Sequence, residues 1–230
     1  HGGTLTVEDT DEVFTIHGLW PNLVKTTTLP PGGVRGHLLW GGDGDVSEFN
    51  GRNVEGAVVL MEFNSWNNWL NAAMLGAQQI IFVEPDSTFT AQSETKFLQV
   101  PNSVERFWID KKSGEKLKEL IAQKDKVNVT LKARMDWEKK ETRNILGWIR
   151  GTDPVLSEKI VVINTYYDAM SVVPARAPGA EMACGIVGMM KLAEYFSKYP
   201  PKHTLLFLAS SAHHLGFRGI CDFLSRHSRK

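Results

Sequence analysis

Short apolar runs alternate with amphipathic stretches through the middle of the chain, between residues 57 and 131. Runs such as Ala57–Met61 are rich in β-branched residues, which is typical of buried strands. The stretch from Trp66 to Gly76 instead repeats its apolar residues at helical spacing, and a glycine is a common helix stop. In chain order, the pattern predicts a strand, a helix, a strand, a helix capped by Ser113 and a strand: residues 57–61, 66–76, 79–83, 113–123 and 127–131. This alternation predicts a small α/β domain over residues 34–133.

Residues 1–33 show no comparable periodicity. They are rich in Gly, Thr and Pro and include the run Leu29-Pro30-Pro31-Gly32-Gly33. Because Gly and Pro interrupt regular structure, we predict an irregular N-terminal segment over residues 1–33.

A second alternating pattern occupies residues 134–230, after a polar stretch that begins the segment. Ile160–Ile163 reads as a buried strand, and residues 185–196 carry a single apolar stripe typical of a helix. The full set of predicted elements is a strand, a strand, a helix, a strand and a helix: residues 145–149, 160–163, 185–196, 204–209 and 216–225. Short connections between strands and helices predict a parallel sheet with helices on both faces.

Polar side chains gather where two of these strands end. Asp168 follows the strand at Ile160–Ile163, Glu181 precedes the next helix, and His213 and His214 follow the strand at residues 204–209. Function in such sheets collects at the carboxyl ends of the strands, and these residue types can bind a metal. Adjacent histidines point in different directions, however. The other interpretation is therefore structural, with one histidine exposed and the other packed under a loop.

The order of motifs around these residues resembles the zinc aminopeptidases and glutamate-carboxypeptidase-like proteins, including the transferrin-receptor relatives. In that family, His-x-Asp ends one strand, Pro-Gly-Ala-x-Asp-x-x-Ser-Gly opens a helix, and Glu-Glu-x-Gly ends another strand. The corresponding segments here are Tyr166-Tyr167-Asp168, Pro178-Gly179-Ala180-Glu181-Met182-Ala183-Cys184-Gly185 and His213-His214-Leu215-Gly216. The resemblance implies that residues 134–230 form part of a three-layer α/β/α zinc-peptidase-like domain with a mainly parallel sheet.

Residues 34–131 resemble the protease-associated domain that often accompanies this family. The similarity is carried by Asn53-Val54-Glu55-Gly56-Ala57-Val58-Val59-Leu60, Leu75-Gly76-Ala77 and Val100-Pro101. Together the two resemblances cover about four fifths of the chain and imply a truncated, degenerate member of the family.

The departures from the family pattern fall on its metal-site positions. Tyr166 stands at a zinc-ligand histidine, and a neutral phenol is a poor zinc ligand. Asp168 matches the aspartate that orients this ligand from outside the metal shell, but its partner is replaced. Glu181 falls at the bridging aspartate and could still bind metal. His213 replaces the general-base glutamate, and His214 replaces a carboxylate ligand but could coordinate metal itself.

Loss of a general base typically costs about 10²–10⁴-fold in rate. Loss of ligands removes the metal that supplies hydroxide at neutral pH. The resemblance therefore implies a non-catalytic binding or scaffold protein without a cofactor, which takes a peptide or protein ligand. The alternative is an active metallopeptidase that cleaves N-terminal or C-terminal peptide bonds with one zinc ion on Glu181 and His214. In either case the family implies an extracytoplasmic or membrane-associated ectodomain, whose anchor would lie outside these residues.

A second motif, Phe14-Thr15-Ile16-His17-Gly18-Leu19-Trp20-Pro21, resembles the first catalytic signature of the secreted acid ribonucleases. That resemblance would make His17 an acid or base in RNA cleavage. The family's second histidine motif has no counterpart here, and its disulfides cannot form from Cys184 and Cys221 alone. The other interpretation is a loop in which Leu19 and Trp20 pack and His17 is incidental.

Charge argues against nucleic acid as a partner, because the 26 basic residues are balanced by 26 acidic ones. No apolar run reaches the length of a membrane helix. Asn128-Val129-Thr130 is a glycosylation sequon, which agrees weakly with an extracytoplasmic setting.

Overall fold

The computed structural model describes residues 2–19, 26–96, 103–171, 173 and 180–227. The chain divides into two compact units: unit 1 comprises His1–Glu138 with Ser171–Arg176, and unit 2 comprises Lys139–Met170 with Ala177–Lys230. Three quoted motif segments lie outside the described residues, namely Trp20-Pro21, Val100-Pro101 and Pro178-Gly179.

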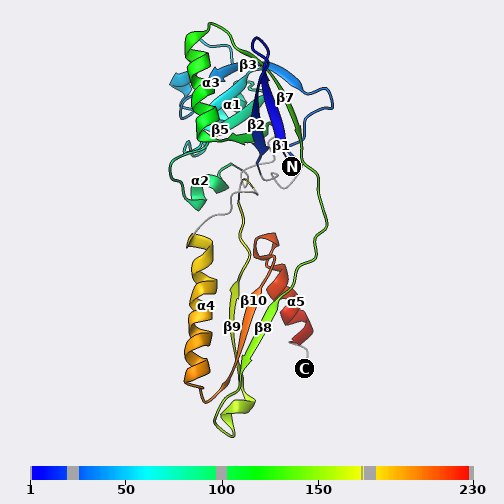
Figure 1. Cartoon of the computed structure of the whole chain (residues 1–230), viewed down its shortest axis with the longest axis vertical. Helices are drawn as coiled ribbons and strands as arrows, with labels where there is room; N and C mark the ends of the chain where they lie inside the picture. Colours follow the sequence, from blue (N-terminus) through cyan, green and yellow to red (C-terminus); the bar gives the residue numbers. More distant parts are fainter. Residues whose placement is uncertain (1, 20–25, 97–102, 172, 174–179, 228–230) are drawn as a thin grey trace. The chain divides into compact units, whose positions relative to one another are not determined.

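Unit 1 is a closed seven-stranded barrel in the strand order β1-β2-β6-β5-β4-β3-β7 (Figure 1). Its strands are β1 (Gly2–Val7), β2 (Glu12–Gly18), β3 (Val34–Trp40), β4 (Val58–Glu62), β5 (Gln79–Val83), β6 (Glu105–Ile109) and β7 (Asn128–Arg134). Its helices are η1 (Val46–Phe49), α1 (Trp69–Met74), α2 (Thr90–Glu94) and α3 (Lys111–Gln123). Strands β3, β4, β5 and β6 run parallel, and the remaining pairings are antiparallel.

The predicted strand at residues 79–83 is confirmed as β5, and the one at residues 57–61 lies within one residue of β4. Helix α3 ends at Gln123 as predicted, but its N-cap is Asp110 rather than Ser113. The Asp110 carboxylate accepts the backbone N–H of Ser113 at 3.0 Å. This hydrogen bond satisfies one of the free N–H groups of the first turn, so the helix begins earlier than predicted.

The prediction of an irregular segment over residues 1–33 is wrong for residues 2–18. Strands β1 and β2 form an antiparallel hairpin that pairs Leu5 with Phe14. Leu5, Val7, Phe14 and Ile16 are buried and point into the barrel core. The alternation is present in the sequence, but each strand contributes only two of these four positions, which is too short a run to give a clear periodic signal.

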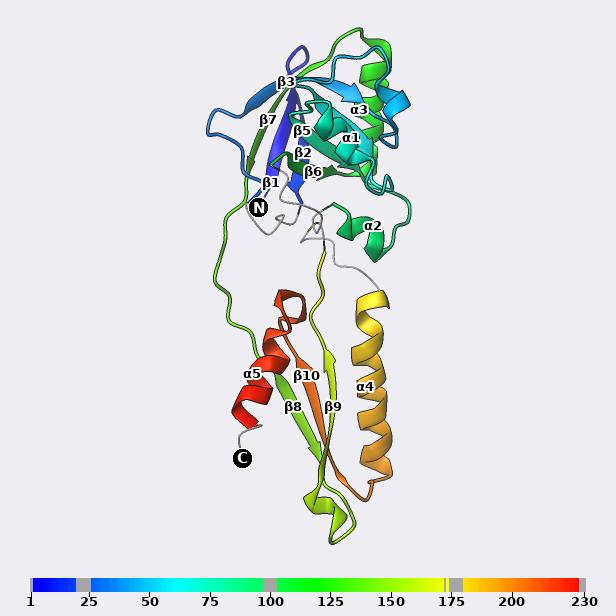
Figure 2. The same ribbon diagram turned by 180° about the vertical axis from the view of Figure 1, so that it is seen from behind.

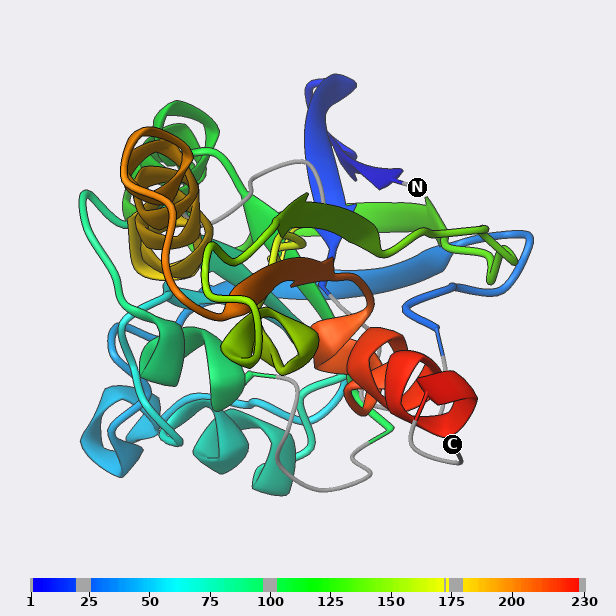
Figure 3. The ribbon, with the colours of Figure 1, turned by 90° about the horizontal axis from the view of Figure 1, so that it is seen from below.

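Unit 2 contains a three-stranded sheet in the order β8-β10-β9 (Figure 2). Its strands are β8 (Ile145–Ile149), β9 (Ile160–Tyr166) and β10 (Thr204–Ser210), and its helices are η2 (Leu156–Glu158), α4 (Ala180–Lys198), η3 (His213–Leu215) and α5 (Arg218–His227). Helices α4 and α5 lie on opposite sides of β10 (Figure 3). A small core on the α4 side joins Met189 to Leu205, Phe207 and Ala209.

The prediction of a mainly parallel sheet in unit 2 needs correction. Strand β9 is parallel to β10, whereas β8 is antiparallel to it. Strands β9 and β10 are joined through a long helix, α4, which is the connection that favours a parallel pair. The segment that contains η2 connects β8 to β9, but these two strands are not neighbours in the sheet, because β10 lies between them. This short connection therefore does not require β8 to run parallel to β10.

Strand β9 is also less buried than its apolar sequence predicts. Ile160, Val161 and Val162 are 52%, 45% and 45% exposed. In the described sheet β9 pairs with β10 alone, so it is an edge strand. The apolar residues of an edge strand lose the cover that a neighbouring strand supplies.

None of the helices in the described part of the chain combines the length and hydropathy that a membrane crossing requires.

Candidate functional site

The carboxyl ends of β9 and β10 bring the predicted site residues together. The parallel register pairs Tyr166 with Ser210, and the Tyr167 N–H donates to the Ser210 carbonyl at 3.1 Å. The chain then leaves both strands at the same edge of the sheet. Asp168 follows β9, and His213 and His214 stand on the short helix η3 after β10.

Asp168 is held by the backbone of the facing loop. Its Oδ2 accepts the His213 N–H at 3.0 Å. Its Oδ1 is buried, and it has no hydrogen-bond partner among the described residues. The carboxylate therefore fixes the position of the His213 main chain rather than the orientation of an imidazole ligand.

Aromatic rings occupy the space between the two strand ends. The Tyr166 phenol stacks on the His213 imidazole, with ring centroids 3.9 Å apart and planes inclined by 23°. The His214 ring meets the edge of Tyr166 at 5.6 Å and lies nearly perpendicular to His213, at 82°. Phe217 packs its edge against His213 at 4.6 Å. We call Tyr166, His213, His214 and Phe217 the aromatic cluster.

The loop that carries the cluster has unusual backbone geometry. Ala212, Gly216 and Phe217 have φ values of +51°, +76° and +56°. Left-handed conformations are sterically costly for residues other than glycine. Hydrogen bonds from Phe217 N–H to the His213 carbonyl (2.9 Å) and from Arg218 N–H to the Ala212 carbonyl (3.2 Å) hold this loop.

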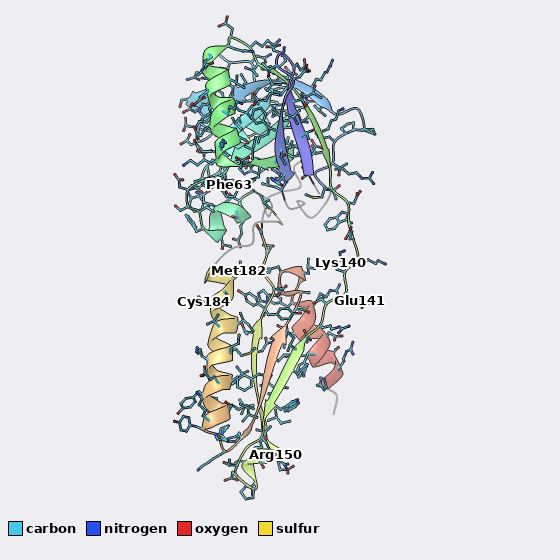
Figure 4. The ribbon with its side chains drawn as sticks, viewed as in Figure 1. Phe63, Lys140, Glu141, Arg150, Met182 and Cys184 are labelled. Atoms are coloured by element: carbon cyan, nitrogen blue, oxygen red, sulfur yellow. The ribbon has the colours of Figure 1, made fainter. Side chains whose placement is uncertain are left out.

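Glu181 lies in the first turn of α4, but its side chain is outside the described residues. Its neighbour Met182, marked in Figure 4, faces the cluster, because the Tyr166 hydroxyl lies 3.8 Å from the Met182 Sδ. The sequence did not single out Met182 or Phe217.

Asn144 is a further residue that the sequence missed. Its amide donates to the Gly219 carbonyl at 2.8 Å, and its Oδ1 accepts the Ser211 N–H at 3.1 Å. It thereby ties the segment before β8 to the loop after β10 and to α5. No motif marks this asparagine, since its partners are brought together only by the fold.

The described residues do not fit a two-zinc site. Within the described part of the chain, no group of three or more His, Cys, Asp or Glu side chains is close enough to hold a metal ion. The phenol of Tyr166 stands among the cluster's rings, and the Asp168 Oδ2 is engaged by a backbone amide. A zinc ion requires nitrogen, sulfur or carboxylate ligands that converge on one point.

His17, the candidate from the ribonuclease-like motif, lies in strand β2 and not in a loop. It pairs with Trp108 of β6, and the two rings are 5.5 Å apart. The position of His17 is therefore part of the barrel's strand pairing.

No family model matches the sequence, and no curated protein matches it. Solved structures do. The zinc aminopeptidase BSAP from Bacillus subtilis has a TM-score of 0.62 and 20% identity over 99% of this chain and 52% of its own. This chain is similar in fold to zinc aminopeptidases. A peptidase M28 precursor from Shewanella amazonensis has a TM-score of 0.59, 13% identity and coverage of 98% and 55%.

Nicastrin, a component of γ-secretase, is a further neighbour, with a TM-score of 0.54, 12% identity and coverage of 95% and 44%. The chain spans about half the length of these structures. At such identities the similarity describes the fold alone. It includes both units of this chain, since nearly all of its residues are covered.

Proposed function

We propose that this chain is a zinc-aminopeptidase-like protein that binds a peptide or protein ligand without hydrolysing it. In this proposal unit 1 is a protease-associated-like domain, unit 2 is a degenerate peptidase-like domain, and the protein is an extracytoplasmic ectodomain. The similarity in fold to zinc aminopeptidases supports the zinc-aminopeptidase-like character of the chain. The aromatic cluster supports binding without hydrolysis.

The observation that carries the proposal is the stack of Tyr166 on His213. A neutral phenol is a poor zinc ligand, and the Tyr166 ring is packed against an imidazole instead. His213 in turn lacks the carboxylate that the resemblance assigns to the general base. At positions 166 and 213, packed rings stand where the resemblance places a metal ligand and a general base. Packed aromatic rings suit a binding surface.

The competing function is a metallopeptidase with one zinc ion on Glu181 and His214. The ring geometry gives it no specific support, because His214 meets the Tyr166 ring edge at 5.6 Å. It remains the alternative that the tests below address.

Replacing Tyr166 with histidine tests the role of this position. An imidazole at position 166 would stand where the resemblance places a zinc-ligand histidine, against the rings of His213 and His214. We expect Tyr166→His to bind zinc at least about tenfold more tightly than the unmodified chain, because Asp168 matches the aspartate that orients this ligand and such a partner typically contributes about 10–100-fold to metal affinity. Competition with a fluorescent zinc chelator measures the affinity.

Tyr166→Phe is the matched control, since it keeps the ring and removes only the hydroxyl. Its zinc affinity is expected to equal that of the unmodified chain. If Tyr166→His bound zinc no better than Tyr166→Phe, the assignment of position 166 to a lost ligand would be wrong.

A further inference from the structure

Trp66, in the loop after β4, has a strained backbone and an exposed side chain. Its φ is +43°, a conformation that bulky residues rarely adopt. Its indole is nevertheless 51% exposed, so burial of the ring does not explain the strain. Strained backbone that the surroundings enforce often marks a functional site.

Three buried polar side chains enforce this conformation. The Trp66 N–H donates to Gln92 Oε1 at 2.9 Å, and its carbonyl accepts from Lys96 Nζ at 2.7 Å and from Thr95 Oγ1 at 3.2 Å. Gln92, Thr95 and Lys96 are all buried, Lys96 completely. The Lys96 ammonium also lies 5.6 Å from the centre of the Phe63 ring, which Figure 4 marks in unit 1.

Phe89 stands beside Trp66 with the same exposure, 51%. The two rings meet edge to face, with centroids 5.5 Å apart and an angle of 68°. The Phe89 carbonyl accepts the Gln92 N–H at 3.0 Å where α2 begins. Asn64 joins the two loops, because its amide donates to the Ser87 carbonyl and its Oδ1 accepts from Thr88 Oγ1, both at 2.8 Å. Both aromatic side chains are thus presented from a cross-linked backbone.

Four acidic residues lie near this pair along the chain, namely Glu62, Glu84, Asp86 and Glu94. Glu62 forms an ion pair with Lys118 at 3.1 Å. Asp86 forms an ion pair with Lys111 at 2.6 Å, and Glu84 Oε2 accepts the Lys111 N–H at 3.2 Å. The other exposed neighbours in the two loops are uncharged and can form hydrogen bonds: Asn64, Asn67, Ser87 and Thr88. These four neighbours match an uncharged partner.

We propose that Trp66 and Phe89 form a docking site for an extended, uncharged, proline-containing segment of a partner protein. Proline rings pack well on aromatic faces, and a polyproline segment is already extended, so little entropy is lost when it binds. The hydrogen-bonded loops that carry Trp66 and Phe89 are already ordered, so this protein also loses little conformational entropy on binding. A rigidly held tryptophan is also the side chain that most often dominates binding energy. The proposal concerns unit 1 and does not depend on the proposed function of unit 2.

The test uses the full 230-residue chain and acetyl-decaproline amide as the probe. The indole N–H signal of Trp66 is assigned by its absence from the NMR spectrum of Trp66→Gly. We expect this signal to shift saturably on titration and Trp66→Gly to weaken binding by at least about tenfold. Glycine adopts φ = +43° without strain, so the thermal unfolding midpoint of the variant should not fall. Trp66→Asn, which also tolerates this conformation, provides a second variant.

Met74→Ala is the matched control, because Met74 is a 76% exposed apolar residue of the same unit. It should leave decaproline binding unchanged. An unshifted Trp66 signal, or equal affinity in Trp66→Gly, overturns the proposal. Saturable shifts with an oligosaccharide such as chitohexaose, in the absence of any with decaproline, overturn it too and identify the site as one for carbohydrate.

Discussion

Replacing Lys96 with methionine is expected to stabilise unit 1 at pH 6 by about 2–4 kcal/mol. Lys96 is completely buried, and burial lowers the pKa of its ammonium group from 10.5 to about 7. At pH 6 the folded protein therefore contains a charge that is costly to remove from water. Methionine has a similar volume and no charge. The variant loses the hydrogen bonds of Lys96, but Thr95 Oγ1 still lies 3.2 Å from the Trp66 carbonyl oxygen and can donate to it.

The pH dependence of the free energy of unfolding shows whether the buried charge of Lys96 causes this effect. The unfolded chain keeps Lys96 protonated up to about pH 10.5, whereas the folded chain releases the proton near pH 7. Unfolding therefore takes up a proton between these values. The free energy of unfolding must rise with pH across this window, by up to about 1.4 kcal/mol per pH unit from this one group. Lys96→Met should remove that slope between pH 7 and pH 9.5.

The measurement is urea unfolding followed by tryptophan fluorescence, since six of the seven tryptophans belong to His1–Glu138 of unit 1. Lys118→Met is the control. Burial is the largest single effect and lowers the pKa of Lys118, but the hydrogen bonds and ion pairs with Glu62 and Glu115 together raise it. The stabilisation from Lys118 is fully present below pH 10.5 and disappears only above it, so this variant should keep the slope. An unchanged slope in Lys96→Met would refute the assignment.

Replacing Gly219 with alanine is expected to destabilise unit 2 by about 1–3 kcal/mol, the usual cost of forcing atoms into a filled space. A Cβ at this position would overlap the Ser211 carbonyl oxygen and lie 2.6 Å from Asn144 Oδ1 and 2.7 Å from the Ser211 nitrogen. Two of these three atoms are backbone and cannot rotate away. The added methyl group would separate α5 from β10 and weaken the hydrogen bonds of Asn144.

Gly188→Ala is the matched control in the same unit. Gly188 lies in the middle of α4, and a Cβ there would meet nothing within 4 Å. Alanine is the better helix former, so this variant should gain up to about 1 kcal/mol. Hydrogen exchange of β10 peptides, followed by mass spectrometry, reports both effects. Faster exchange in Gly219→Ala and not in Gly188→Ala is the expected pattern, and equal rates in the two variants would contradict it.

The sequence predicted the elements that carry a strong periodic signal of their own. Strand β10 contains the unbroken apolar run Leu205–Ala209 and is buried along its whole length. Helix α4 was recognised from one apolar stripe, although it begins five residues before the predicted start. Strands β1 and β2 were missed because each holds only two of the buried core residues, which is too short a pattern to stand out. Their hairpin gains its stability from the barrel, which a local pattern does not reveal.

The sequence predicted where the candidate site lies, but it did not predict the contacts among the side chains of the site. The rule that loops meet at the carboxyl ends of parallel strands correctly placed Asp168 near His213. The stacking of Tyr166 on His213 depends on the left-handed residues Ala212 and Phe217, neither of which the sequence marks. The contacts of Asn144 with Ser211 and Gly219 span more than sixty residues. Such contacts follow from the fold alone.

Peptide hydrolysis in the presence of zinc is the most direct test of the central claim, that the positions of Tyr166 and His213 no longer support catalysis. The chain is incubated with zinc and leucyl-p-nitroanilide, with the Bacillus subtilis zinc aminopeptidase as positive control. We expect no release of p-nitroaniline above the rate without protein, because neither a general base nor a convergent ligand set is present among the described residues. Zinc-dependent hydrolysis that is lost in both Glu181→Gln and His214→Ala would contradict the account and establish the one-zinc peptidase in its place.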